Sequence, residues 1–271
     1  MNNKISHVLL RIYALLFIVY LLVPLAIMGG AAFNDSRFPS ILPWKGFTWR
    51  WFVDLYNDET MWQATLNTAI VGFFVVLLAV PIGTAGAILV NSLKGRSRTL
   101  LYATMIAPVL TPGAVIGIST LLFWHMFKVP AGLHLSVLGQ TSFIAAYVML
   151  MVLARLQSFD GGLEEAALDL GASHSQMMRR ILLPHLYPAI VTGAVLAFFQ
   201  SVENFNTTQF TRGASTTLTV YVGSKVRSGI TPTINALALI MITITIISAL
   251  AYEINRRRVE ARNRAFESAA N

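Results

Sequence analysis

Long runs of apolar side chains dominate the chain, and short polar segments separate them. Crossing the hydrocarbon core of a membrane takes about 20 apolar residues in an α-helix. The runs of this length cover residues 8–33, 64–90, 101–127, 135–156, 186–206 and 234–252. None alternates apolar and polar residues with the period of two that a membrane barrel strand requires. The pattern therefore predicts an all-α integral membrane fold, with six transmembrane helices forming a single domain over residues 1–271.

The polar segment 157–185 has a different pattern, typical of two short amphipathic helices. Gly171 is expected to end the first helix, as glycine commonly does just past a helix end. Ser173 and Gln176 form a capping-box sequence that predicts the start of the second helix, and Pro184 permits a turn into the fifth span. The apolar positions at helical spacing are Leu163, Ala166, Ala167 and Leu170 in the first helix and Met177, Met178, Ile181 and Leu182 in the second.

The composition agrees with a membrane environment. Of the 271 residues, 55% are hydrophobic and 12% are charged, whereas a soluble domain has about 25% charged residues. The chain has no cysteine, which excludes disulfides, thiolate metal sites and cysteine nucleophiles. The net charge of +8 matters through its distribution, because basic residues favour cytoplasmic loops.

The distribution of Lys and Arg predicts the orientation. With the N-terminus inside, thirteen of the 20 basic residues fall in inner segments and seven in outer segments. This asymmetry predicts that both termini are cytoplasmic. We interpret Arg256, Arg257 and Arg258, directly after the last run, as an anchor for that span and not as a nucleic-acid patch.

The outer segment 34–63 contains four of the five tryptophans, at positions 44, 49, 51 and 62. Tryptophan favours the membrane–water interface, where its ring is buried and its N–H stays hydrated. We therefore predict an interfacial helix around Thr48–Tyr56 that steadies the outer face. An aromatic box for a cationic ligand is the alternative.

The inner segment also carries a known motif. Glu165-Ala166-Ala167, Gly171 and Ile181-x-Leu183-Pro184, at this spacing, resemble the EAA loop of permease subunits of type I bacterial ABC importers. The resemblance implies a cytoplasmic coupling-helix loop over about 157–185 that docks on the ATPase subunit and transmits its motion. The residues implied to couple are Glu164, Glu165, Ala166, Ala167, Asp169, Gly171, Ile181, Leu183 and Pro184.

Within that family the chain is most similar to the second permease of spermidine/putrescine-type systems. The similarity rests on segments 33–36, 44–48, 159–173 and 235–238. It implies import of polyamines by a multi-pass protein of the bacterial inner membrane. The implied partners are a second, homologous permease in a heterodimer, two copies of a cytoplasmic ATPase that binds ATP and Mg, a periplasmic substrate-binding protein and membrane lipid, with no nucleic acid.

Glu203 is the one carboxylate inside a predicted span. A carboxylate at the bilayer centre costs about 2.5–3.5 kcal/mol on insertion scales, so Glu203 is expected to face a cavity or a partner. The polar residues that follow it, up to Gln209, favour a cavity lining; a helix end that reaches the outer interface is the alternative. The candidate substrate-pathway residues are Glu203, Asn204, Asn206, Thr111, Pro112, Tyr147 and Tyr221.

The third run contains Pro108, Pro112, Gly113 and Gly117, which predict a bend at Leu110–Gly113. Two positions depart from the polyamine-type pattern. Ser201-Val202-Glu203-Asn204 has one acid where that family has Ser-x-Asp-Asp, and Pro112 is followed by Gly113 where an acid is frequent. Fewer acids leave room for another small cationic or zwitterionic metabolite as substrate.

Several chemistries lack their motifs. There is no Gly-x-x-x-x-Gly-Lys-Ser/Thr phosphate loop, no His-Glu-x-x-His and no other metal-ligand spacing. We therefore predict no catalytic residues, no metal and no cofactor on this chain. A self-contained secondary carrier or channel is the alternative function, although such proteins usually show internal repeats or intramembrane charge relays.

Overall fold

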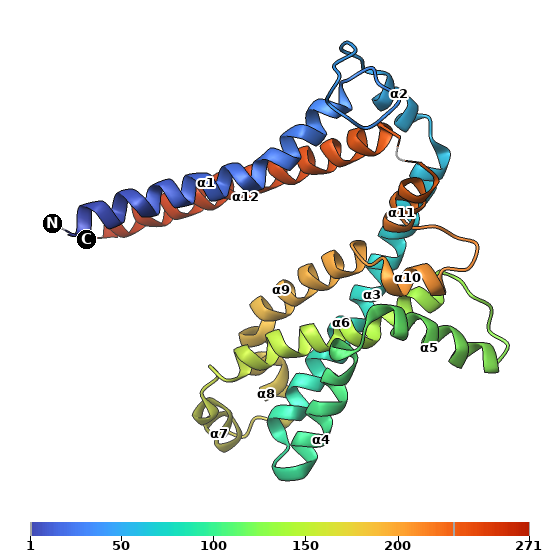
Figure 1. The fold of residues 1–271 in the computed structure, drawn as a ribbon. Coiled ribbons are helices and arrows are strands. Elements are labelled where there is room, and N and C mark those ends of the chain that lie inside the picture. Colours follow the sequence, from blue (N-terminus) through green and yellow to red (C-terminus); the bar gives the residue numbers. More distant parts are fainter. Residues whose placement is uncertain (1, 230, 271) are drawn as a thin grey trace. The chain divides into compact units, whose positions relative to one another are not determined.

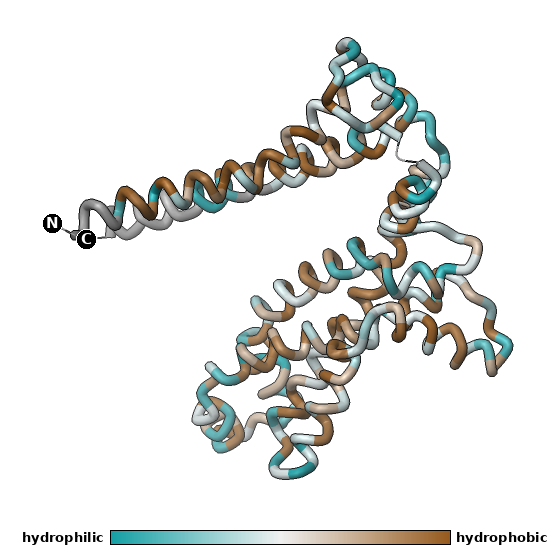
Figure 2. Tube along the Cα trace, in the orientation of Figure 1, coloured by the Kyte–Doolittle hydropathy of each residue, from teal (hydrophilic) through white to brown (hydrophobic). Residues whose placement is uncertain are grey.

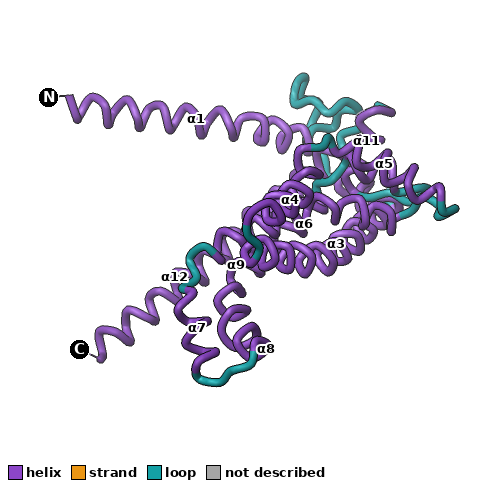
Figure 3. Tube along the Cα trace, turned by 90° about the horizontal axis from the view of Figure 1, so that it is seen from below, coloured by secondary structure: helices purple, strands orange, loops and turns teal. Residues whose placement is uncertain are grey.

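The computed structural model describes residues 2–229 and 231–270, and their side chains from 7 to 258 except at 249 and 252. Every regular element of this part is a helix (Figure 3), apart from one isolated bridge between Asn34 and Phe47. The elements, labelled in Figure 1, are α1 (Asn2–Ala32), α2 (Arg50–Tyr56), α3 (Glu59–Ser92), α4 (Gly95–Ile106), η1 (Ala107–Leu110), α5 (Gly113–Met126), α6 (Leu133–Leu156), α7 (Gly161–Asp169), α8 (His174–Met177), η2 (Met178–Leu182), α9 (Leu183–Val202), α10 (Asn206–Thr211), α11 (Leu218–Ser228) and α12 (Thr233–Ala270).

Five helices in the described residues are long and apolar enough to cross a membrane, and a bent pair makes a sixth span if it counts as one. The apolar stretches of these helices are visible in Figure 2. The all-helical membrane fold expected from the hydrophobic pattern is confirmed. The third span is bent, as the sequence predicts: Gly95–Leu110 and Gly113–Met126 meet at an angle of 106°. The bend lies at the predicted Leu110–Gly113, where Pro112 has no N–H to continue the helix.

The fifth span differs from the sequence prediction at both ends. It was expected to begin at Leu186 after a turn at Pro184, but α8, η2 and α9 form one continuous stretch over His174–Val202. Pro184 cannot donate a hydrogen bond to the preceding turn, and that turn widens into the π-helix η2. At the other end α9 stops at Val202, before the predicted Asn206.

The chain folds into two compact units. Unit 1 comprises Met1–Glu59 and Ser224–Asn271, with α1, α2 and α12; unit 2 comprises Thr60–Gly223. In unit 1 the end of α1 packs on the start of α12, where Gly29 faces Leu239. Toward the two termini these helices diverge (Figure 3), and residues 8–26 of α1 are exposed.

A loop built around Asn34 follows α1 in unit 1. The Asn34 side chain is fully buried; its Nδ2 donates to the backbone oxygens of Ser40 (2.8 Å) and Pro43 (3.1 Å), and its Oδ1 accepts from Lys45 N at 2.8 Å. Trp51 Nε1 donates to the Asn34 backbone oxygen at 2.9 Å. A helix is present at the predicted place as α2, with Trp51 buried in the loop; its position at the membrane interface stays a prediction.

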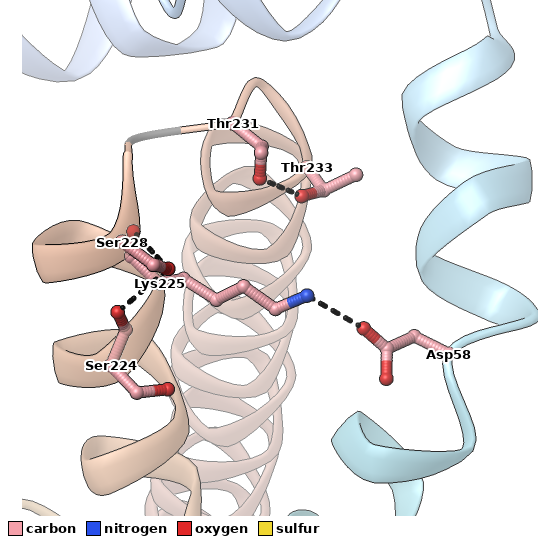
Figure 4. Close-up of polar contacts among 6 residues, drawn as sticks. All are labelled: Asp58, Ser224, Lys225, Ser228, Thr231 and Thr233. Atoms are coloured by element: carbon pink, nitrogen blue, oxygen red, sulfur yellow. Dashed lines mark hydrogen bonds and ion pairs between the residues drawn. The ribbon is translucent and has the colours of Figure 1, made fainter.

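An ion pair joins the two chain segments of unit 1 beyond α2. Lys225 Nζ lies 3.3 Å from Asp58 Oδ2, with the side chains 35% and 21% exposed. Short polar contacts surround it on the α11–α12 segment, including Ser228 Oγ to the Ser224 backbone oxygen at 3.0 Å (Figure 4). A partly exposed ion pair of this kind contributes about 0–1 kcal/mol to the stability of the fold. It links α11 to the segment before α3.

The core of unit 2 lies where α3, α6 and α9 pack together. Its fully buried apolar side chains include Val75, Val148, Met149 and Leu186. The same cluster extends to Ala167, Met177 and Leu182 at the cytoplasm-facing loop predicted from the sequence. The core of the spans and the short helices therefore form one packed body.

Candidate functional site

The segment 160–182 forms the predicted helical elbow, and local hydrogen bonds define each of its ends. Asp160 caps α7, with Oδ1 accepting from Gly162 N at 2.9 Å. Gly171 N donates to Leu168 O at 2.9 Å and Ala172 N donates to Ala167 O at 3.0 Å, the two bonds of a Schellman motif. Gly171 has φ +84°, a conformation that glycine adopts without the steric cost of a Cβ.

The second helix of the elbow starts at the predicted capping box. Ser173 Oγ accepts from Gln176 N at 3.3 Å, and Ser173 N donates to Gln176 Oε1 at 2.9 Å. These reciprocal bonds satisfy backbone donors that a helix start otherwise leaves unpaired. The turn between α7 and α8 is thus held at both sides by hydrogen bonds.

The elbow has a buried face and an open face. Ala167, Met177 and Leu182 pack into the core of unit 2. Ala166, Glu165 and Asp169 are exposed, Glu164 is half-buried, and the apolar side chains of Leu163 and Leu170 are 52% and 89% exposed. An exposed apolar surface rimmed by carboxylates is typical of a protein interaction site.

The remaining motif residues lie where the elbow joins the fifth span. Ile181 packs against the core. Leu183 and Pro184 line an open hollow of about 400 Å³ together with Arg179 and Tyr187. The structure therefore places the motif residues on the elbow and at the start of the fifth span, with Ala166 and Glu165 outward and Ala167 inward.

A second group of candidate residues meets at two helix breaks of unit 2. The first break is Thr111–Pro112, between η1 and α5; the second is Glu203–Phe205, between α9 and α10. Thr207 Oγ1 donates to Gly113 O at 3.1 Å, which brings the start of α10 to the start of α5. Non-helical backbone at membrane depth is tolerated where it is packed in protein or lines a polar cavity.

Three glycines make this junction tight. A Cβ added at Gly117 would lie 2.8 Å from the Thr207 backbone oxygen, and one at Gly139 would lie 2.9 Å from Thr207 Cγ2. At Gly113 an added Cβ would lie 3.1 Å from Asn206 Cβ. The absence of side chains at these positions lets α10 pack directly on α5 and α6.

Much of the polar run after Glu203 is therefore internal. Thr207, Thr208 and Thr211 are fully buried. Asn204 Oδ1 accepts from the backbone N–H groups of Thr207 and Thr208, both at 3.2 Å, and so satisfies two donors in the first turn of α10. Glu203 is the C-cap residue of α9 and is exposed, as is Asn206.

The structure brings Thr111, Pro112, Glu203, Asn204 and Asn206 to this junction. It does not bring Tyr147 there, which lies on α6 two helical turns from Gln140 and is half-buried. Tyr221 is buried within α11. Of the candidate polar side chains, Glu203 and Asn206 are the ones that project from the junction.

Sequence reasoning missed the polar side chains of α6 at the junction. Ser136 Oγ contacts Thr211 Oγ1 at 2.8 Å, and Gln140 bonds to Ser201 and Thr208. The available signal was the cluster of polar residues at 136, 140 and 141 in an otherwise apolar span, because buried polar groups in membrane helices require partners.

These features define a class: an all-helical membrane protein with a capped helical elbow on one loop and helix breaks that meet in its interior. The chain belongs to the family described as "Binding-protein-dependent transport system inner membrane component", which it matches over residues 69–261. It is a multi-pass, non-catalytic permease subunit of an ABC importer of the inner membrane. The alternative of a self-contained carrier or channel does not hold.

The curated relatives span nearly the whole chain. It is 33% identical over 236 residues to the "Spermidine/putrescine transport system permease protein PotC" of Haemophilus influenzae, covering 86% of this chain and 91% of that protein. It is 32% identical over 264 residues to the "Putrescine transport system permease protein PotI" of Escherichia coli (strain K12), covering 94% and 93%.

A solved structure with the same fold is a chain of a bacterial alginate ABC transporter in complex with an alginate pentasaccharide-bound periplasmic protein. The TM-score is 0.72 at 18% identity, covering 94% of this chain and 95% of that one. The predicted resemblance to polyamine-type ABC permeases is thus confirmed at the level of the family, and the fold is that of importer permeases.

Proposed function

We propose that this permease subunit imports polyamines, and that Glu203 contacts an ammonium group of the substrate. The observation that carries the proposal is the place of Glu203: an exposed carboxylate beside the junction of two broken spans, in a chain whose relatives are named for spermidine and putrescine. The position at a helix break supports a cavity lining more than a plain helix end, because the backbone around Glu203 is packed in protein.

One carboxylate matches one end of a polyamine. Ammonium–carboxylate hydrogen bonds are about twice as strong as neutral ones. They become stronger still where water is partly excluded, because the effective dielectric constant is lower there. The other amines of a long polyamine then need acids or aromatic faces on the second permease. A substrate with one positive group, cationic or zwitterionic, fits the same carboxylate.

The experiment compares Glu203→Gln with Glu203→Asp in the complete transporter. Gln keeps size and polarity but removes the charge, whereas Asp keeps the charge on a shorter side chain. We expect Gln to lower uptake of radiolabelled putrescine by at least about tenfold at subsaturating substrate, from the loss of a charged hydrogen bond, and Asp to lower it less.

Glu59→Gln is the matched control, because Glu59 is another exposed carboxylate beside a helix end. It should transport like the wild type. Glu203 has no role in recognising the substrate if the Gln variant, co-purified with its partners, transports at the wild-type rate.

The open face of the elbow supports a second part of the proposal. Ala166, Leu163 and Leu170 offer an apolar patch on which a partner can pack closely, and Glu165 offers a charge for its basic groups. We assign this face to the ATPase subunit. Glu164, Asp169, Ile181, Leu183 and Pro184 then shape and support the elbow, and Ala167 joins it to the core.

The partners that we propose are of the kind that ABC importers use. The chain forms half of a pathway, as one domain in a heterodimer with a homologous permease. Two copies of a cytoplasmic ATPase bind ATP and Mg below it, and a periplasmic binding protein delivers substrate above it. Both termini lie in the cytoplasm, in line with the distribution of Lys and Arg.

A further inference from the structure

Gln140 is a buried side chain that bonds to two different helices. It lies on α6 and is 1% exposed. Its Oε1 accepts from Ser201 Oγ at 2.5 Å, and its Nε2 donates to Thr208 Oγ1 at 2.7 Å. Both ends of the amide are therefore used inside the protein.

The two partners of Gln140 lie on opposite sides of the second helix break. Ser201 is in the last turn of α9 and Thr208 is in the first turn of α10. Glu203, Asn204 and Phe205 lie between them, where the helical hydrogen-bond pattern is interrupted. One side chain thus holds together the two ends of the segment that carries Glu203.

The direction of the bonds is determined by the backbone. Asn204 Oδ1 accepts from the N–H groups of Thr207 and Thr208, so this atom is an acceptor. Thr208 Oγ1 lies 3.2 Å from it and must donate its only proton there. Thr208 Oγ1 is then left to accept, which requires the amide nitrogen of Gln140 to face it.

The chain of bonds extends from α6 to the turn itself. It runs from Gln140 through Thr208 to Asn204, the residue after Glu203. The backbone oxygen of Asn204 accepts from Thr219 Oγ1 at 3.1 Å. The turn is therefore held from α6 on one side and from α11 on the other.

We propose that Gln140 is a positioning residue for substrate recognition: by bonding to Ser201 and Thr208 it holds the break between α9 and α10 so that Glu203 points at the substrate. This inference rests on the proposed role of Glu203. Without these bonds, the Glu203 carboxylate would lose conformational entropy when it binds the substrate. Ordering the segment beforehand removes this entropic cost from the free energy of binding.

The test removes one arm of the bond network and asks whether the effect depends on Glu203. Thr208→Val keeps the shape of the side chain but cannot bond to Gln140 or Asn204. Uptake of radiolabelled putrescine is measured in proteoliposomes that contain the complete transporter with saturating binding protein. The substitution is made in the wild type and in the Glu203→Gln variant.

With Glu203 present, we expect Thr208→Val to lower uptake about tenfold, as for the loss of one buried hydrogen bond that orders a binding group. In the Glu203→Gln background, the same substitution should lower it by less than about twofold, because coupled sites are not additive. Thr208→Ser, which keeps the hydroxyl, should restore uptake.

Thr141→Val is the matched control. Thr141 lies next to Gln140 on α6, it is 6% exposed, and its hydroxyl has no hydrogen-bond partner. Removing that hydroxyl should leave uptake unchanged. If Thr208→Val does not assemble with its partners, Ser201→Ala tests the other arm of the same amide in both backgrounds.

The outcomes separate the two claims. Equal losses from Thr208→Val in both backgrounds overturn the positioning role, because the hydroxyl then acts only on stability. No loss in the wild-type background overturns it as well. Wild-type uptake by the Glu203→Gln variant alone overturns the proposed substrate contact, and the role of Gln140 falls with it.

Discussion

Single polar side chains organise the backbone at several points of this protein. Asn34 and Gln140 use their amides to bond to groups that are distant in sequence, and Asn204 uses its amide oxygen to bind the first turn of α10. A buried amide that bonds at both ends fixes a local conformation, because each unpaired group would cost about 1–3 kcal/mol.

Asn34→Asp is the prediction at the residue scale. The Asp keeps the oxygen that accepts from Lys45 N but places a second oxygen where Nδ2 donates to the carbonyls of Ser40 and Pro43. We expect the loop to open more often, and trypsin to cleave after Arg37 and Lys45 about tenfold faster.

The measurement is limited proteolysis of the purified transporter, followed by mass spectrometry of the fragments. Asn57→Asp is the control, since Asn57 is exposed and lies at the end of α2. Unchanged cleavage of the Asn34→Asp variant would show that the loop does not depend on this amide.

The elements are joined in two ways, through capped turns and through broken helices. The elbow belongs to the first kind: its turn is held by a Schellman motif and a capping box. The junction of α5 and α10 belongs to the second kind, held by close glycine contacts and buried hydroxyls. A capped turn transmits force as a rigid unit, whereas a break can present side chains to a pathway.

Gly171 provides the prediction at the element scale. An added Cβ there meets no atom within 4 Å, so the cost of Gly171→Ala is the backbone strain at φ +84°, about 1–2 kcal/mol. We expect Gly171→Val to abolish substrate-stimulated ATP hydrolysis and uptake, Gly171→Ala to reduce both, and Gly171→Asn to preserve most activity, because Asn tolerates this conformation.

Gly161→Ala is the control for this series. A Cβ at Gly161 also meets no atom within 4 Å, but its φ is not positive. Glu165→Lys, on the open face of the elbow, should abolish substrate-stimulated ATP hydrolysis and uptake while leaving the chain folded. Normal transport by a well-expressed Gly171→Val variant would contradict a coupling role for the elbow.

At the scale of the molecule, the path of the bent third span decides on which side of the membrane each later loop lies. Within unit 2 the segment after α5 lies beside the end of α10, since Gly132 N donates to Thr211 O at 2.8 Å. The N-terminal third of α3 lies near the segment after α10, since Asn67 Nδ2 donates to Thr216 O at 2.8 Å. Helices α4 and α5 therefore lead from one end of the unit to the other, and we expect the bent pair to cross the membrane as one broken span.

The prediction at this scale uses reporters of sidedness. A reporter inserted at Asn57 should be periplasmic, one at Ala131 periplasmic and one after Arg258 cytoplasmic. A cytoplasmic reporter at Ala131 would make α4 and α5 a re-entrant loop. The C-terminus would then lie outside, against the distribution of Lys and Arg.

The sequence by itself determined the features that depend on near neighbours in the chain. The apolar runs predict the membrane helices, Gly171 the end of α7, Ser173 and Gln176 the start of α8, and Pro112 the place of the bend, because capping, backbone conformation and hydrophobic length are local properties.

Tertiary structure decided which polar residues are buried and which are presented. Sequence reasoning treated positions 203–209 as one polar run, yet Thr207 and Thr208 are buried against α5 and α6 while Glu203 is exposed. It also did not separate the outward Ala166 from the inward Ala167. These outcomes depend on contacts between residues far apart in the chain, such as Gln140 with Thr208, which no local pattern encodes.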